Sequence, residues 1–423
     1  MSVPTLISTT KKWLADLTVG GPWGRTLSKQ HQYNMHWFWF DGLFASASDN
    51  IVVNYISIYI IALGASETQI GLMSSFSSIA CALILLPGAI LAERTQRKLK
   101  ISFICGIFAR LMILLLIFVP TLFKNPALVW IAIALSVGRD AFNNFGYPAW
   151  MDVANGTVPI EGRGRFFGSR NFIMSVTGIL TTLLAGKLIT GFAGTLGYQI
   201  ALAVSFMFGM ASTFSFGHIH ERGVSLRSET RSFNLKDIVQ MFKGQPQFTA
   251  LTLTAALWNF GIYISGPFFN VQMVNVLKFS AASIGFVAVI TSVTTLVTQN
   301  QIGAYADRVG MRRLQYLSMW FIPLLPLSWI FATQVWHVAL INAFSGIVWG
   351  AFNLVSFNLL LATIPQGQVP RYSAVYQIVI MLSMALGAAA GSVLIAHWGF
   401  ISVLIGSAVV RYAATILFGK WVK

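Results

Sequence analysis

Four ionisable side chains interrupt long apolar stretches of this 423-residue sequence. Asp41 and Asp49 lie in one such stretch, and Arg139 and Asp140 lie in another. An acid beside an arginine holds or releases a proton according to whether the cation stays close. We therefore take these side chains as candidates for proton coupling, in which an acid binds the proton and the arginine is its partner. Asp49 and Arg139 could meet as a switchable pair or as a permanent structural pair, or Asp140 could hold Arg139 locally.

The apolar stretches that surround these charges are typical of membrane helices. The chain is 56% hydrophobic and 9% charged, whereas an ordinary soluble domain has roughly 25% charged residues. A helix needs ~20 apolar residues to cross a bilayer. We predict an all-α integral membrane protein with twelve transmembrane helices, at residues 34–63, 68–92, 100–119, 127–154, 166–190, 197–219, 248–276, 281–305, 314–332, 336–364, 372–396 and 399–419.

The net charge of +16 follows the predicted membrane topology. With the N-terminus placed inside, 22 of the 28 basic residues lie on the inner side and three lie outside or near it. Such an excess of Lys and Arg marks the cytoplasmic side of a membrane protein. We predict a multi-pass protein of the cell (inner) membrane with both termini in the cytoplasm. We expect no cleaved signal peptide, because the first 33 residues contain no apolar run that ends in a small-residue cleavage site. The basic charge does not indicate nucleic-acid binding.

Further charges within or near the predicted spans are Arg110, Asp152, Arg170 and Arg411. A charge at the centre of the bilayer costs about 2.5 to 3.5 kcal/mol even on insertion scales, so each one needs a partner, a water-filled cavity or a function. We expect Asp152 and Arg170 to pair with each other near the cytoplasmic surface. The predicted helices of the second half contain no acid.

Polar and aromatic residues recur at helical spacing in four of the predicted helices. Beside Asp49, the residues Ser46, Asn50 and Asn54 form a polar stripe that is expected to line water or substrate. Trp258 and Tyr376 could stack on a solute or could pack in the core. The complete set of predicted cavity residues is Asn50, Asn54, Asn143, Trp150, Trp258, Asn259, Tyr263, Asn270, Trp349, Asn353 and Tyr376.

The sequence contains an internal repeat. The segment GASETQIGL at residues 64–72 aligns with FSAASIGF at residues 279–286, and this places Ser66 and Ser280 as N-caps of two helices. We predict a cytoplasmic segment at 1–33, a six-helix bundle at 34–219, a linker with an interfacial helix at 220–247, and a second six-helix bundle at 248–423.

Two predicted cytoplasmic loops carry related motifs. The second, GAYADRVGMRR at residues 303–313, has a weaker copy, AILAERTQRK, at residues 89–98. The motif resembles the loop signature of the major facilitator superfamily, although Ala89 and Gln96 replace its glycines in the first copy. The resemblance implies a cytoplasmic gate in which Glu93 faces the start of the helix at 372–396. The predicted gate residues are Glu93, Arg94, Arg97, Gly303, Asp307, Arg308, Gly310 and Arg312.

The resemblance also implies secondary transport by alternating access, with the first, fourth, seventh and tenth helices around a central cavity. Asp49 is then the main proton-coupling acid and Arg139 its partner, with Asp41 and Asp140 as further candidates. The GPxxGG motif typical of proton antiporters is absent from residues 166–190. We expect proton-coupled movement of a small organic solute; the alternatives are export of amphipathic or lipid-like compounds, or a non-transporting membrane sensor.

The sequence lacks motifs typical of membrane-embedded enzymes or ATP-driven pumps. GxSxG, HExxH and the P-loop do not occur, so we expect neither an enzyme nor a cofactor. Cys81 and Cys105 fall within predicted spans, and we interpret them as buried apolar residues rather than as a metal site. The expected partners are a small-molecule substrate, protons and membrane lipids, and the protein is expected to be a monomer.

The charge distribution makes a testable prediction about topology. A cysteine introduced in the first motif loop as Gln96→Cys should not react with a membrane-impermeant thiol reagent added to intact cells, because this loop is cytoplasmic. It should react once the cells are permeabilised. Labelling of intact cells equal to that of permeabilised cells would place the loop outside and reverse the predicted topology.

Overall fold

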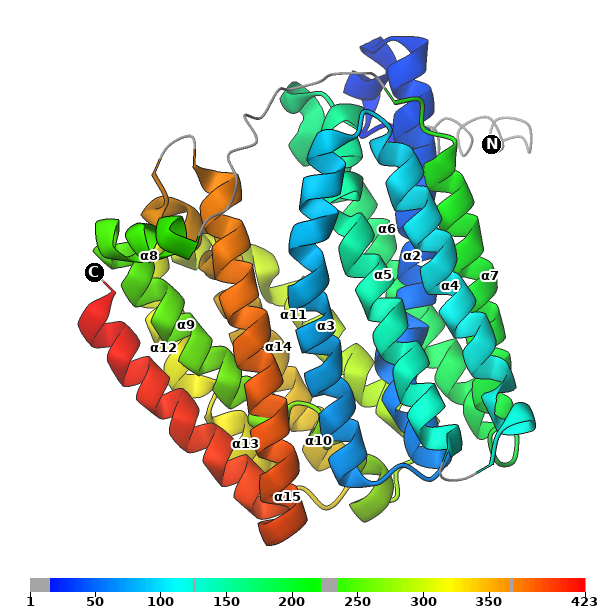
Figure 1. Cartoon of the computed structure of the whole chain (residues 1–423), viewed down its shortest axis with the longest axis vertical. Helices are drawn as coiled ribbons and strands as arrows, with labels where there is room; N and C mark the ends of the chain where they lie inside the picture. The colour runs from blue at the N-terminus through cyan, green and yellow to red at the C-terminus, as the bar shows by residue number, and fades with distance from the viewer. Residues whose placement is uncertain (1–15, 125–126, 222–234, 366–367, 423) are drawn as a thin grey trace, which may run out of the picture. The chain divides into compact units, whose positions relative to one another are not determined.

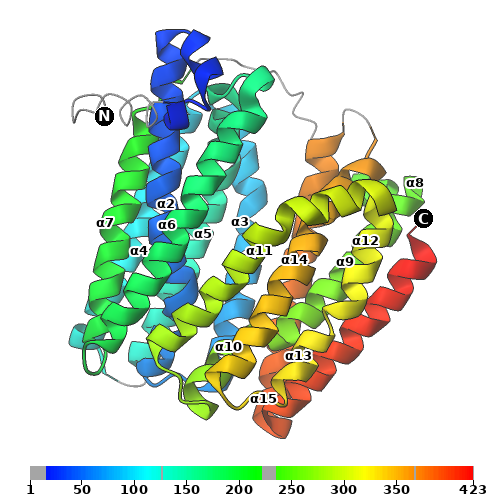
Figure 2. The ribbon, with the colours of Figure 1, turned by 180° about the vertical axis from the view of Figure 1, so that it is seen from behind.

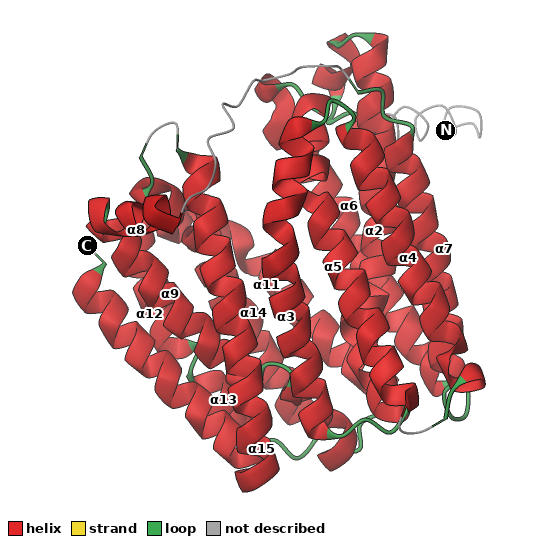
Figure 3. Cartoon of the chain, in the orientation of Figure 1, coloured by secondary structure: helices red, strands yellow, loops and turns green. Residues whose placement is uncertain are grey.

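The computed structural model describes residues 16–124, 127–221, 235–365 and 368–422. This part of the chain is helical and contains no strand (Figure 3). Nine of its helical stretches are long and apolar enough to cross a membrane, and one of these, residues 371–421, contains two of the predicted helices. The prediction of an all-α membrane protein is confirmed.

The described residues group into two compact units (Figure 1). The first contains residues from 1–56 and 84–230, and the second contains residues from 57–83 and 231–423. Residues 57–83, which the sequence analysis assigned to the first bundle, thus group with the second unit. The predicted bundle boundaries at 34–219 and 248–423 remain a prediction.

The first half of the chain supplies six long helices. They are α2 (Lys29–Ala62), α3 (Glu67–Arg94), α4 (Lys98–Leu122), α5 (Ala127–Thr157), α6 (Arg163–Thr190) and α7 (Leu196–Gly217). Each corresponds to one of the first six predicted spans, although the predicted spans at 34–63 and 197–219 extend one and two residues past the ends of α2 and α7. Within the first unit α4 packs against α5 and α7, and α6 packs against α7.

The second half is more interrupted. Its elements are α8 (Leu235–Gly244), α9 (Pro246–Ser265), α10 (Phe268–Val271), a π-helical turn (Gln272–Val276), α11 (Ala281–Val309), α12 (Met311–Phe321), α13 (Leu324–Trp329), α14 (Val335–Thr363) and α15 (Val369–Trp421). The predicted helix at 248–276 is broken before Pro267, which lacks a backbone N–H. The helix α15 joins the last two predicted helices through Gly399, where φ is +74°.

Side chains at the starts of two helices satisfy free backbone groups as predicted. The Ser66 hydroxyl accepts from the Gln69 amide at 3.3 Å, and the Gln69 side chain accepts from the Ser66 amide at 2.9 Å. Ser280 accepts from the Ser283 amide at 3.2 Å. The interfacial helix of the predicted linker corresponds to α8, and the adjoining residues 222–234 lie outside the described part.

Glycines allow α15 and α9 to pack backbone against backbone, side by side in Figures 1 and 2. A Cβ atom on Gly387 would lie 2.3 Å from the carbonyl oxygen of Phe260, and one on Gly391 would lie 2.2 Å from that of Ile264. Nearby, the Ser407 hydroxyl donates to the Gly261 carbonyl at 2.6 Å. The separation of these helices therefore depends on the missing side chains.

In the first unit, hydroxyl groups fix α2 against its neighbours. Tyr55 donates to the Thr182 carbonyl of α6 at 2.7 Å, and the hydroxyls of Ser48 and Ser205 lie 3.0 Å apart between α2 and α7. The middle of α2, which carries Asp49, is held from two sides as a result.

We predict that Gly387→Ala destabilises the protein, because the new methyl group pushes α15 away from α9. Overpacking of this kind costs roughly 1–3 kcal/mol, so the midpoint of thermal unfolding in detergent should fall by several degrees. The matched control is Gly168→Ala in α6, where a Cβ atom meets nothing within 4 Å. An unfolding midpoint for Gly387→Ala at or above that of the control would contradict the proposed packing.

Candidate functional site

The Asp49 carboxylate of α2 is shared by two arginines. Its Oδ1 accepts from Arg139 Nη2 of α5 at 2.9 Å and from Arg110 Nη1 of α4 at 3.1 Å. Arg139 Nη1 also donates to Asp140 Oδ1 at 3.0 Å. The contacts of Arg139 with Asp49 and with Asp140, which the sequence left as alternatives, therefore occur together.

Burial differs sharply within this group. The Asp49 side chain is 44% exposed, whereas those of Arg110 and Arg139 are 8% and 9% exposed. Arg110 crosses α7 at Gly209, where a Cβ atom would lie 2.5 Å from Arg110 Cδ. Glycine at this position leaves the room that the arginine needs to reach Asp49.

A second ion pair, between Asp41 and Arg170, is buried and fully bonded. Arg170 Nη2 of α6 donates to Asp41 Oδ2 at 3.0 Å, and the Ser212 hydroxyl donates to Asp41 Oδ1 at 2.7 Å. Arg170 Nε also donates to the Phe38 carbonyl at 3.0 Å, with its guanidinium 4.3 Å from the centre of the Phe38 ring. These contacts satisfy both ions of the pair without a ligand.

The predicted pair of Asp152 with Arg170 is wrong. Lys98 Nζ donates to Asp152 Oδ2 at 2.7 Å. Asp152 is 47% exposed, so the flexible lysine at the start of α4 reaches it. Arg170 instead points inward, where the buried acid Asp41 compensates its charge.

Both ion-pair groups border one pocket in the first unit, with a volume of about 340 Å³. Asp41 and Asp49 therefore face the same space, although they lie eight residues apart on α2. Charged and aromatic side chains share the walls; the principal ones are Asp41, Asp49, Arg110, Arg170, Phe142, Asn143, Tyr147, Trp150 and Phe216. The pocket suits a small molecule with both polar and apolar parts.

Of the predicted cavity residues in the first half, Asn143 and Trp150 line this pocket. Asn50 and Asn54 serve other contacts. Asn50 Nδ2 donates to the Ser46 carbonyl at 3.0 Å, and Asn54 Nδ2 donates to the Thr182 hydroxyl of α6 at 3.2 Å. This polar stripe contributes to the contact between α2 and α6.

The predicted cavity residues of the second half lie largely in packed surroundings. Trp258 is 1% exposed and stacks on Phe352 with ring centres 5.4 Å apart, and Trp349 and Tyr376 pack against the same hydrophobic cluster. Asn259 donates to the Ala255 carbonyl of its own helix at 2.9 Å. The remaining three are the half-buried Tyr263 and Asn270 and the exposed Asn353.

The predicted gate residues lie in and around the turns after α3 and α11. Their exposed members are Glu93, Arg94, Arg97, Asp307, Arg308, Gly310 and Arg312. Gly303 is half-buried, and Gly310 has a φ of +89°, which suits the tight turn into α12. Arg312 Nε donates to the Val422 carbonyl at 2.6 Å, close to the end of α15. The gating role of these residues stays a prediction.

Sequence analysis did not assign a partner to Arg110 or a role to Glu221. The Glu221 carboxylate accepts from the backbone amides of Lys98 and Leu99 at 3.0 and 3.4 Å and so caps the start of α4. The signal for Arg110 was its charge within an apolar helix, which demands compensation. Spacing along one helix does not identify a partner on another helix.

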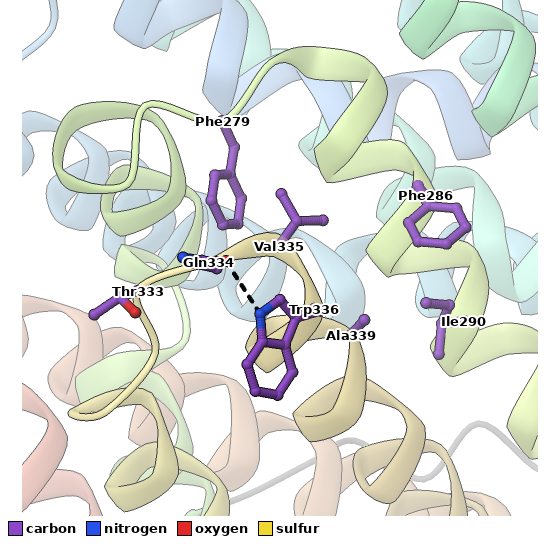
Figure 4. Close-up of a pocket in the computed structure, with 8 residues that line it drawn as sticks. All are labelled: Phe279, Phe286, Ile290, Thr333, Gln334, Val335, Trp336 and Ala339. Atoms are coloured by element: carbon purple, nitrogen blue, oxygen red, sulfur yellow. Dashed lines mark hydrogen bonds between the residues drawn. The ribbon is translucent and has the colours of Figure 1, made fainter.

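A second pocket, of about 660 Å³, lies in the second unit (Figure 4). Apolar side chains such as Phe279, Phe286 and Ile290 line most of it, and Trp336 Nε1 donates to Gln334 Oε1 at 3.1 Å. Its lining contains no ionisable group and none of the predicted site residues. In the part of the chain that the structure describes, no three His, Cys, Asp or Glu side chains group as a metal ion would require.

Sequence comparison relates the chain to a protein with a described activity. The chain is 25% identical, over 384 residues, to the multi-drug resistance efflux pump PmrA of Streptococcus pneumoniae, and the match covers 87% of this chain and 90% of the relative.

Solved structures with a similar fold include transporters and a transporter homologue. A bacterial homologue of the iron transporter ferroportin in its inward-facing state has a TM-score of 0.71 at 14% identity, over 92% of this chain and 98% of that one. A D-xylose–proton symporter has a TM-score of 0.68 at 14% identity, over 92% and 96% of the two chains. At these identities the likeness concerns the fold.

The sequence profile of the Major Facilitator Superfamily matches residues 38–272 and 251–423, which together span nearly the whole chain. The twelve-helix fold and the transporter neighbours agree with that match. The chain is a multi-pass membrane transporter, and it belongs to the major facilitator superfamily.

Proposed function

We propose that this chain is a proton-coupled secondary transporter that moves a small organic solute by alternating access, with Asp49 as the coupling acid and Arg139 as its partner. One observation carries the proposal: a half-exposed carboxylate borders the pocket and is bonded to two buried arginines. Both termini and the two motif loops lie in the cytoplasm in this proposal, and two six-helix bundles form the moving parts.

Protonation of Asp49 changes the forces at the pocket. Protonation removes the negative charge that attracts the two guanidiniums, so the neutral acid holds Arg110 and Arg139 less firmly. Arg139 keeps its hydrogen bond to Asp140 and can therefore move away from Asp49 without losing every charged partner. A proton that binds one conformation better than another shifts the population between them, which is the property that coupling requires.

Asp41 suits this role less well than Asp49. Its side chain is only 7% exposed, and its two oxygens already accept from Arg170 and Ser212. Breaking a buried ion pair by removing one charge costs about 3–5 kcal/mol. The Asp41–Arg170 pair therefore supports the bundle in this proposal, and the more accessible Asp49 exchanges the proton.

Export of amphipathic compounds is the second candidate. The likeness to an efflux pump over most of the chain supports it, as do the aromatic walls of the pocket. Vesicles of opposite orientation distinguish uptake from export. Thermal-shift measurements with diverse solutes would identify ligands, since a ligand that binds the folded state stabilises it.

We predict that Asp49→Asn abolishes proton-driven accumulation in proteoliposomes, because asparagine cannot exchange the proton. Exchange of labelled for unlabelled solute across the membrane, which needs no net proton movement, should continue. The control is Asp152→Asn, which neutralises an exposed acid outside the pocket. Accumulation by Asp49→Asn with an unchanged pH dependence would assign Asp49 a structural role.

For the motif loops, we predict that Asp307→Asn and Glu93→Gln slow transport severalfold and leave ligand affinity nearly unchanged. Both acids are exposed and lie outside the pocket, so their effect should fall on the rate of conformational change. Initial transport rates at matched protein amounts, together with ligand titrations, separate the two quantities. Normal rates in both variants would limit the loops to a role in membrane topology.

A further inference from the structure

We infer that Arg110 and Arg139 form a binding site for an anionic group of the substrate, a carboxylate or a phosphate, and that Asp49 competes with this group for the two guanidiniums. The inference rests on the proposed function, since it names the class of solute that the proton accompanies. It assigns to Arg110 a role in substrate binding in addition to its contact with Asp49.

The two arginines have hydrogen-bond donors that the protein does not satisfy. A guanidinium carries five N–H donors. The Nε atoms of both Arg110 and Arg139 are buried and have no hydrogen-bond partner in the described structure. Buried polar atoms in folded proteins nearly always have partners, and an ion is one explanation for those that lack one. Arg110 lines the pocket, and Arg139 lies behind Asp49, which also lines it. Two such donors, one at the wall of the pocket and one directly behind it, point to an acceptor.

The geometry at Asp49 leaves room for a better acceptor. Both arginines bind the same oxygen, Oδ1, so neither forms the two-point contact that a guanidinium makes with a carboxylate or a phosphate. A ligand anion with two or three oxygens in the pocket could form that contact. Asp49 is the most exposed member of the group, and a ligand in the pocket meets it before the more deeply buried arginines.

The charges around the pocket set the number of charges on the ligand. We define the charge cluster as Asp41 and Asp49 of α2, Arg110 of α4, Arg139 and Asp140 of α5, and Arg170 of α6. It contains three acids and three arginines and is neutral when all are ionised. One proton on Asp49 leaves a single positive charge, which one anionic group neutralises.

The anion and the proton should therefore favour each other. An ionised Asp49 repels the anion and occupies its donors, and protonation removes both obstacles. By linkage, a bound anion then favours protonation of Asp49 to the same degree. Other titratable side chains that line the pocket are Cys105 of α4 and Tyr147 of α5, and α7 contributes the non-titrating Ser212 and Thr213.

The test measures binding to the purified full-length protein in detergent, without a proton gradient. The probes are acetate, benzoate and inorganic phosphate, with benzamide as the uncharged counterpart of benzoate. Acetate and benzoate are ionised at both pH 5.5 and pH 8. Phosphate gains a second charge between these values, so it serves to compare variants at one pH. We expect at least one of the two carboxylates to bind roughly tenfold more tightly at pH 5.5, whereas benzamide shows no such preference.

Variants separate this inference from a general effect of pH. Asp49→Asn should bind the same anion at pH 8 as tightly as the wild type does at pH 5.5, a gain that misfolding cannot produce. Arg110→Gln should lose the anion, while Lys187→Gln, which removes an exposed charge of α6, should bind normally.

The inference is overturned if neither carboxylate binds more tightly at low pH and Asp49→Asn gains no affinity for any of the three anions at pH 8. That result leaves the proposed function standing, because proton-driven accumulation of an uncharged solute would still depend on Asp49. Conversely, the anions could bind as expected while solute accumulation does not depend on Asp49. That result would overturn the coupling proposal and leave the anion site in place.

Discussion

The need to compensate charge inside a low-dielectric bundle governs the structure of the first unit. The six members of the charge cluster come from α2, α4, α5 and α6, and each ion lies within about 3 Å of an opposite charge. A single unpaired ion there would cost several kcal/mol. Small residues make the pairing possible: Gly209 gives Arg110 its path, and the Ser48–Ser205 contact holds α2 close to α7.

Much of the fold could be predicted from the sequence, because bilayer thickness converts apolar length directly into helices. The caps at Ser66 and Ser280 followed from local chemistry. Partners across helices were harder to predict, since rotation and tilt decide which faces meet. The Asp49–Arg139 contact was expected among several possibilities, whereas Lys98 was not expected at Asp152 because a long side chain reaches well beyond its own helix.

The two halves share a framework and differ in charge. Ser48 and Ser205 join α2 to α7, and Ser265 and Ser407 join α9 to α15, each pair 3.0 Å apart. The residue after Ser48 is Asp49, whereas the residue after Ser265 is Gly266. Arg411, which is 3% exposed, donates to the Ile262 carbonyl and the Ser265 hydroxyl near the broken end of α9, where the helix dipole favours a cation. The three acids of the charge cluster, Asp41, Asp49 and Asp140, all lie in helices of the first half.

The balance of three acids and three arginines also determines how the pocket responds to membrane voltage. Moving one elementary charge through a potential of 100 mV involves about 2.3 kcal/mol. A site of zero net charge can open first to one side of the membrane and then to the other without this work. This holds for the empty site and for a site that holds a proton together with a monovalent anion. In the proposed cycle, in which a proton and a monovalent anion move together, the electrical potential would neither drive nor oppose either half, and the pH difference and the solute gradient alone would set the direction of net movement.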